Sequence, residues 1–199
     1  MSMSYYLEHR DAFLEGLKTF LRIPSISTLP EHLPDIRRAA EFVRDEFREA
    51  GLNSAELIEG PGNPLVYAEW TGAPGKPTLL LYGHYDVQPP DPLDEWKSPP
   101  FEPSIRGEDL FARGASDDKG QTYILIKAVE GFLKTAGRLP INVKFLIEGR
   151  EQIVRAGEAL AIPPHAPHGV EVLEDAIVVD VFSPAREDWI RGDDAYLRG

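Results

Sequence analysis

Apolar residues recur at helical spacing in three segments, so we predict three helices. The first ends at Ile23-Pro24, because proline disfavours helix in the residue before it. The second ends at Gly51, a candidate left-handed cap, and the third covers residues 119–135. The apolar positions are Phe13, Leu14, Leu17, Phe20 and Leu21 in the first helix, Ile36, Ala40, Val43 and Phe47 in the second, and Ile124, Ala128, Val129 and Phe132 in the third.

Apolar and β-rich runs between these helices predict strands. Residues 65–70 form one, and the continuous apolar runs 78–82 and 141–147 are suited to buried parallel positions. A further strand is predicted over residues 105–111, after a turn-rich passage at 89–103. Strands and helices that alternate in this way indicate an α/β layered domain.

The pattern changes near residue 150. No helix-length apolar periodicity remains, and short β-rich pieces alternate with turns. Candidate strands cover residues 153–154, 159–162, 170–172 and 176–182, and a short helix covers 186–190. We therefore divide the chain into an α/β part, residues 1–149, and an all-β part, residues 150–199, with no flexible linker between them.

Composition limits the partners and the chemistry. The net charge of −12 repels nucleic acid and anionic membranes over most of the surface. The chain has no cysteine, so any metal must be held by His, Asp and Glu. Residues 1–22 show no apolar block with a cleavage site, and no run reaches membrane-spanning length. We expect a cytoplasmic protein with no nucleic-acid or membrane partner.

Two acidic constellations could carry chemistry. His84 and Asp86 lie two residues apart at the end of a strand, so one imidazole nitrogen could bind a metal while Asp86 accepts the other ring N–H. A surface histidine beside an acid is the alternative. Asp117 and Asp118 open the third helix after Gly114-Ala115-Ser116. Capping of the helix start explains one of the two carboxylates, and the other is a candidate metal ligand.

The segments Leu80–Pro89 and Arg113–Gln121, with Trp96 and Pro99-Pro100-Phe101 between them, resemble the dipeptidase branch of the co-catalytic zinc peptidases, the carnosinase and succinyl-diaminopimelate desuccinylase kind. This resemblance implies a three-layer α/β/α catalytic domain, of which residues 1–149 are the first part. It implies His84 as a zinc ligand, Asp86 as its orienting partner and Asp117 as the bridge between two zinc ions. The substrate would be a dipeptide or an N-acyl amino acid.

The same resemblance places a general base at Glu151, in Glu148-Gly149-Arg150-Glu151-Gln152. Gln152 stands where the family has a carboxylate ligand, and an amide oxygen is a poorer zinc ligand. The later ligands and the lid domain of the family are not in this sequence. One zinc ion or none is therefore the expectation, against two in the family.

Residues 157–169 resemble the second motif of cupins, small β-barrels that hold a metal, and His168 falls at a cupin ligand position. The first cupin motif is missing, so the expected structure is an all-β half barrel. A solvated turn histidine is the alternative for His168. A truncated sheet and a half barrel each leave an open edge, from which we expect a homodimer.

Three functions follow from these observations. The first is a zinc-dependent hydrolase of dipeptides or N-acyl amino acids, with Glu151 as base. The second is a peptidase and cupin hybrid that binds metal without turnover, and the third is a cupin-like binding module that uses His168. Loss of hydrolysis on replacing Glu151 or Asp117 separates the first from the other two.

Overall fold

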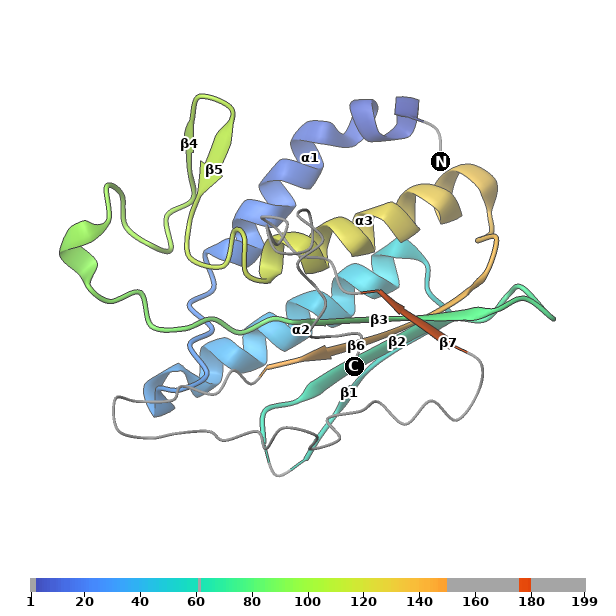
Figure 1. The fold of residues 1–199 in the computed structure, drawn as a ribbon, viewed down its shortest axis with the longest axis horizontal. Coiled ribbons are helices and arrows are strands. Elements are labelled where there is room, and N and C mark those ends of the chain that lie inside the picture. Colours follow the sequence, from blue (N-terminus) through green and yellow to red (C-terminus); the bar gives the residue numbers. More distant parts are fainter. Residues whose placement is uncertain (1–2, 61, 150–175, 180–199) are drawn as a thin grey trace, which may run out of the picture.

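The computed structural model describes residues 3–60, 62–149 and 176–179 (Figure 1). The elements, in chain order, are α1 (Met3–Leu21), α2 (Leu33–Ala50), β1 (Ser54–Ile58), β2 (Leu65–Trp70), β3 (Thr78–His84), β4 (Ser104–Arg106), β5 (Asp109–Phe111), α3 (Lys119–Ala136), β6 (Asn142–Glu148) and β7 (Ala176–Val179). Short 3₁₀ turns lie at Pro30–His32 and Leu93–Glu95.

The three predicted helices are confirmed as α1, α2 and α3. Helix α1 ends at Leu21, two residues before Ile23-Pro24. Helix α2 ends at Gly51, which has a φ of 95° and donates its N–H to carbonyl groups of the last turn, as a left-handed cap does. Local sequence signals were therefore sufficient to place both helix ends.

One sheet joins strands of both directions in the order β1-β2-β6-β3-β7. Strand β2 is antiparallel to β1 and β6, whereas β3 is parallel to β6 and β7. The chain passes from β3 through α3 to its parallel neighbour β6. The predicted α/β fold is confirmed, as are the strands at 65–70, 78–82 and 141–147; β1 was not predicted.

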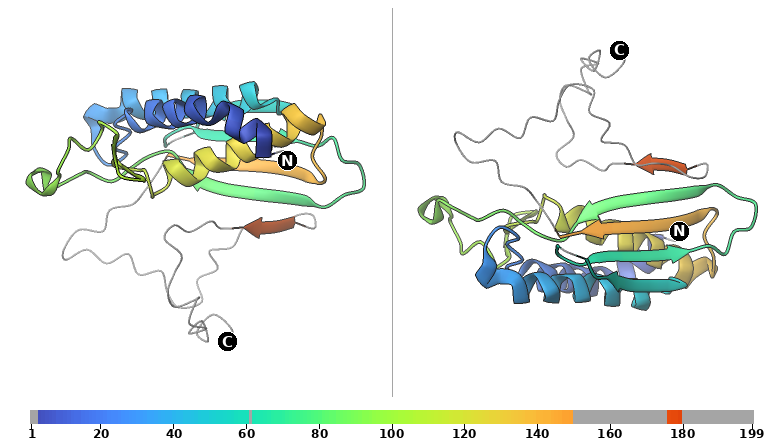
Figure 2. Two further views of the ribbon diagram at one scale, coloured as in Figure 1. Left: turned by 90° about the horizontal axis from the view of Figure 1, so that it is seen from above. Right: turned by 90° about the horizontal axis from the view of Figure 1, so that it is seen from below.

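The core lies between the sheet and the helices, all three of which cover the same face (Figure 2). Alternate residues of β2 and β6 are buried on that face, and Phe47 of α2 packs on Phe145 of β6 with ring centroids 4.6 Å apart. The other face of the sheet carries no helix from the described residues. The expected three-layer arrangement is thus present as two layers in this part of the chain.

Two local predictions were wrong. Residues 105–111 are not one strand, because a turn at Gly107, with a φ of 65°, folds β4 and β5 into an antiparallel hairpin. Ile124 does not face the core but is 64% exposed, and Ile126 is buried instead. Val129 of the same predicted face is buried and Phe132 packs against the core, so the face is otherwise as predicted there.

Only β7 is described from the segment that was predicted to be a cupin-like half barrel. It lies within the predicted strand 176–182 and pairs in parallel with β3, so it extends the α/β sheet instead of starting a separate barrel. The other strands and the helix predicted after residue 150 lie outside the described residues. The domain boundary between 149 and 150 therefore stays a prediction. None of the helices that the structure describes is long and apolar enough to cross a membrane.

Candidate metal centre

The candidate residues meet at the edge of the sheet where β3 and β6 end. His84 is the last residue of β3, and Glu148, its register partner, is the last residue of β6. Asp117 lies two residues before α3, which starts at the same edge because the helix runs back along the sheet between two parallel strands. The carboxyl ends of parallel strands are where open α/β sheets bind ligands.

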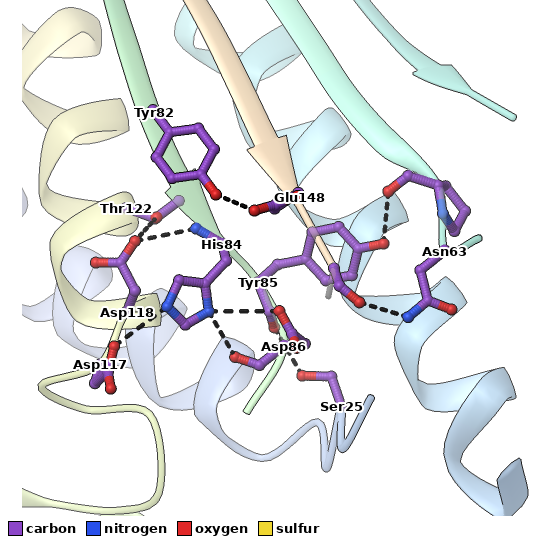
Figure 3. Close-up of polar contacts among 12 residues, drawn as sticks. Ser25, Asn63, Tyr82, His84, Tyr85, Asp86, Asp117, Asp118, Thr122 and Glu148 are labelled. Carbon is purple, nitrogen blue, oxygen red and sulfur yellow. Dashed lines mark hydrogen bonds and ion pairs between the residues drawn. The ribbon is translucent and has the colours of Figure 1, made fainter. Parts of the chain in front are cut away.

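His84 lies between two aspartates (Figure 3). Its Nδ1 is 3.2 Å from the main-chain carbonyl oxygen of Asp86 and 3.4 Å from the carboxylate Oδ1 of the same residue. Its Nε2 is 3.2 Å from Oδ1 of Asp117. A proton on Nδ1 would be donated to Asp86, which leaves the lone pair of Nε2 directed at Asp117.

Burial differs sharply along this row of three side chains. Asp86 is fully buried, the side chain of His84 is 17% exposed, and that of Asp117 is 79% exposed. The end of the row at Asp86 is fixed inside the protein, whereas the end at Asp117 opens to solvent. An ion or a substrate could therefore reach Nε2 of His84 from the side of Asp117.

This geometry fits part of a zinc site. Two ligand atoms on one tetrahedral zinc ion are roughly 3.3 Å apart for ordinary Zn–N and Zn–O bonds. The 3.2 Å between Nε2 of His84 and Oδ1 of Asp117 is close to that value. Within residues 3–60, 62–149 and 176–179, however, no group of three or more His, Cys, Asp or Glu side chains could hold a metal ion. The described residues fit half of a site, and further ligands must come from elsewhere.

The other two predicted site residues, Glu151 and His168, lie outside the described residues. Hydrogen bonds fix the end of β6, the strand that precedes Glu151 in the sequence. The carbonyl of Glu148 accepts the N–H of Tyr85 at 2.8 Å, its carboxylate accepts the hydroxyl of Tyr82, and Asn63 donates to the carbonyl of Gly149. A Cβ at position 149 would lie 2.2 Å from the ring of Tyr85, so glycine is required there by close packing.

The structure also brings in residues that sequence reasoning missed. Helix capping was expected of one of the two aspartates, but Asp118, at the N-cap position of α3, makes no side-chain capping bond. Its Oδ2 accepts the main-chain N–H of His84 at 3.0 Å and the hydroxyl of Thr122 at 3.1 Å. Burial raises the pKa of Asp118, and the bonds from His84 and Thr122 act in the opposite direction.

Lys119, the first residue of α3, and Ser25, in the loop after α1, connect the site to the end of α1. The Lys119 ammonium is fully buried, donates to the carbonyl groups of Phe20 and Ile23 at 3.1 and 2.6 Å, and has its pKa lowered to about 7 by burial. The hydroxyl of Ser25 donates to the carbonyl of Tyr85 at 2.8 Å. A lysine at a helix start and a serine in a distant loop carry no local signal of such roles, because both depend on a tertiary contact.

Residues 80–186 match the model of the Peptidase family M20/M25/M40, which is more than half of the chain. The chain belongs to this peptidase family. The match includes both constellations, His84 with Asp86 and Asp117 with Asp118, and it extends past residue 150.

Several of the similar proteins are dipeptidases. The Beta-Ala-His dipeptidase of Rattus norvegicus is 33% identical in an alignment of 156 positions that covers 72% of this chain and 32% of that protein. The Cys-Gly metallodipeptidase of Schizosaccharomyces pombe is 29% identical in an alignment of 201 positions that covers 96% of this chain and 39% of that protein. The crystal structure of human carnosine dipeptidase 1 matches with a TM-score of 0.68 and 32% identity, over 73% of this chain and 33% of that chain.

These matches define what the chain covers. It spans about a third of the length of the curated relatives named above, and it corresponds to part of the catalytic domain of an M20 peptidase. The cupin resemblance receives no support, since the family match continues through residues 157–169 to residue 186. The expectation of a hybrid with a cupin is likewise unsupported.

Proposed function

We propose that this chain supplies part of the centre of a zinc-dependent hydrolase that cleaves the amide bond of dipeptides or N-acyl amino acids. The observation that carries the proposal is the position of His84, with Nδ1 on Asp86 and Nε2 facing Asp117. The relatives support the substrate class, because they include a Beta-Ala-His dipeptidase, Cys-Gly metallodipeptidases and succinyl-diaminopimelate desuccinylases.

In this proposal each residue of the site has its own role. Nε2 of His84 and the carboxylate of Asp117 hold zinc, and the buried Asp86 keeps the proton of His84 on Nδ1. Bound zinc polarises a carbonyl group and lowers the pKa of water. Glu151, three residues after the end of β6 in the sequence, is proposed to take a proton from the attacking water and pass it to the leaving amine.

A second candidate is metal binding without turnover. The number of ligands favours it: the described residues supply two, and Gln152 replaces a family carboxylate. Association as a homodimer through sheet edges stays a proposal, and static light scattering of the purified chain tests it.

Zinc titration against a chromophoric chelator tests the metal centre. We expect at least one tightly bound zinc ion per chain. Both His84→Ala and Asp117→Ala should weaken binding by more than the ~10–100-fold that loss of an outer-shell partner costs. His9→Ala and Asp11→Ala, both in α1, are the matched controls and should bind as the wild type does; His9 is half-buried and Asp11 is exposed. Equal zinc binding in all five proteins would refute the assignment of His84 and Asp117.

A panel of β-Ala-His, Cys-Gly and N-succinyl amino acids tests the hydrolase. We expect zinc-dependent release of the amine, and a ~10²–10⁴-fold slower rate in Glu151→Ala with unchanged zinc affinity. Zinc binding without hydrolysis of any substrate would select the second candidate. Hydrolysis that survives both Glu151→Ala and Asp117→Ala would reject the proposed mechanism.

A further inference from the structure

The outer edge of β3 changes partners along its length. Strand β7, residues 176–179, pairs with residues 78–81 of β3, from Thr78 with Ala176 to Leu81 with Val179. At the end of β3 the N–H of Tyr85 points to β6, where it bonds to the carbonyl of Glu148. The N–H of His84, its neighbour in the chain, points to the opposite side. There it donates to a side chain, the carboxylate of Asp118.

The carboxylate of Asp118 binds this edge through one of its oxygens. One oxygen, Oδ2, accepts both the His84 N–H at 3.0 Å and the Thr122 hydroxyl at 3.1 Å. The main chain adds a further restraint, because the N–H of Thr122 donates to the carbonyl of Asp118 at 2.9 Å. Thr122 lies in the first turn of α3. Asp118 is therefore hydrogen-bonded both to α3, through Thr122, and to β3, through the N–H of His84.

Gly83 makes this contact possible. A Cβ at position 83 would lie 2.6 Å from Oδ2 of Asp118 and 2.6 Å from Oγ1 of Thr122. Real side chains do not approach that closely, so any other residue would push the carboxylate or the hydroxyl away from β3. Gly83 from one motif and Asp118 from the other are therefore structurally interdependent.

We propose that Asp118 is a positioning residue for the candidate metal centre: it fixes the main chain of His84 and directly follows Asp117 in the chain. The two candidate ligands are 33 residues apart in sequence, and Asp118 links them through a single carboxylate. This inference rests on the proposed zinc centre. It assigns the second aspartate of the Asp117-Asp118 pair a role in metal affinity that helix capping does not give it.

Three variants test the inference. Asp118→Ala removes the acceptor, Thr122→Val removes one donor at nearly constant shape, and Asp118→Asn keeps an oxygen that can accept both bonds. We expect Asp118→Ala to raise the zinc Kd by ~10–100-fold, as loss of an outer-shell partner does. Thr122→Val should raise it less, and Asp118→Asn should retain most of the affinity.

A readout without metal separates positioning from general destabilisation. Hydrogen exchange of the His84 amide in the zinc-free protein should accelerate in Asp118→Ala and stay slow in Asp118→Asn. Tyr5→Phe is the matched stability control, because it removes the 2.9 Å bond to Glu130 far along α3 and should leave zinc affinity and His84 exchange unchanged. If Asp118→Ala does not fold, Thr122→Val carries the test on both readouts.

The possible outcomes can be distinguished. Zinc affinity and His84 exchange that are unchanged in Asp118→Ala, or in Thr122→Val if the alanine variant does not fold, overturn this inference and leave the zinc centre standing. A Kd that rises equally in Asp118→Ala and Tyr5→Phe also overturns it, because stability alone would then explain the effect. No zinc binding by the wild type would overturn both the inference and the proposed function.

Discussion

Gly83→Ala should destabilise the protein by crowding the junction of β3 and α3. The added Cβ would meet Oδ2 of Asp118 and Oγ1 of Thr122 at 2.6 Å each, about 0.8 Å short of an ordinary 3.4 Å contact. Neither oxygen can move away freely. The first is bonded to the His84 N–H at 3.0 Å, and the second is bonded to the first at 3.1 Å.

The magnitude follows from these contacts. Inserting a methyl group into a packed site costs about 1–3 kcal/mol. Displacement of the carboxylate would also lose two hydrogen bonds, at about 1 kcal/mol each. The lower entropy of the unfolded chain after a Gly→Ala change returns about 0.4–1 kcal/mol. We therefore expect Gly83→Ala to lower the free energy of unfolding by about 2–4 kcal/mol.

Urea unfolding followed by circular dichroism measures this change. With a slope of ~2 kcal/mol per molar, the midpoint should fall by ~1–2 M urea. Gly60→Ala is the matched control, because nothing lies within 4 Å of a Cβ there and its φ is not in the left-handed region. It should stay within about 0.5 kcal/mol of the wild type.

A double variant makes the prediction sharper. Thr122→Ala removes one of the two oxygens that the new methyl group meets, so Gly83→Ala should cost less in that background, with a coupling of ~0.5 kcal/mol or more. Strict additivity would show that the methyl group does not meet Thr122. A Gly83→Ala variant as stable as Gly60→Ala would refute the reasoning from close approach altogether.

Substitutions at three other positions, Lys127, Lys119 and Gly149, give further predictions for the stability of the fold. Lys127→Met leaves Glu46 and Glu130, 2.6 and 2.7 Å from the ammonium, without their cation, and should cost about 3 kcal/mol by urea unfolding at pH 7. Burial lowers the pKa of Lys127, but its bonds to the two glutamates raise it by more, so the pKa lies above the ordinary value of 10.5. The ion pair therefore stabilises the fold fully below pH 10.5 and progressively less as the pH rises further. In alkaline thermal scans the wild type should lose stability more steeply than Lys127→Met. Lys119→Met should cost about 2 kcal/mol by the same urea assay, because two buried carbonyl groups lose a charged donor while the cost of burying the ammonium disappears. Gly149→Ala would place a Cβ inside the ring of Tyr85, so it should lower the thermal midpoint of unfolding more than Gly60→Ala does. Equal midpoints would contradict the close packing of Tyr85 on Gly149.

Local patterns predicted most of the fold of residues 3–149. Helix ends at Leu21 and Gly51 depend on proline and glycine rules that act over a few residues. The strands at 78–82 and 141–147 were recognisable because both are continuous apolar runs. The exposed Ile124 was mispredicted because an apolar side chain alone does not reveal which helix face meets the sheet and which meets α1.

For the site, the sequence by itself determined the candidate ligands and their chemistry. With no cysteine, a metal must bind to His, Asp and Glu, and the spacing of His84 and Asp86 and the pair Asp117-Asp118 singled out the residues. It could not determine which aspartate of the pair faces solvent and which turns inward, since both positions allow helix capping.

Only the tertiary structure decided which of the two aspartates turns inward and which faces solvent. The end of β3 meets the start of α3, and there the N–H of His84 has the carboxylate of Asp118 as its partner. Asp118 satisfies that N–H and is drawn inside, and Asp117 is left 79% exposed beside Nε2 of His84. The physical reason is that a main-chain donor needs an acceptor, and which side chain supplies it depends on a contact between residues 34 positions apart.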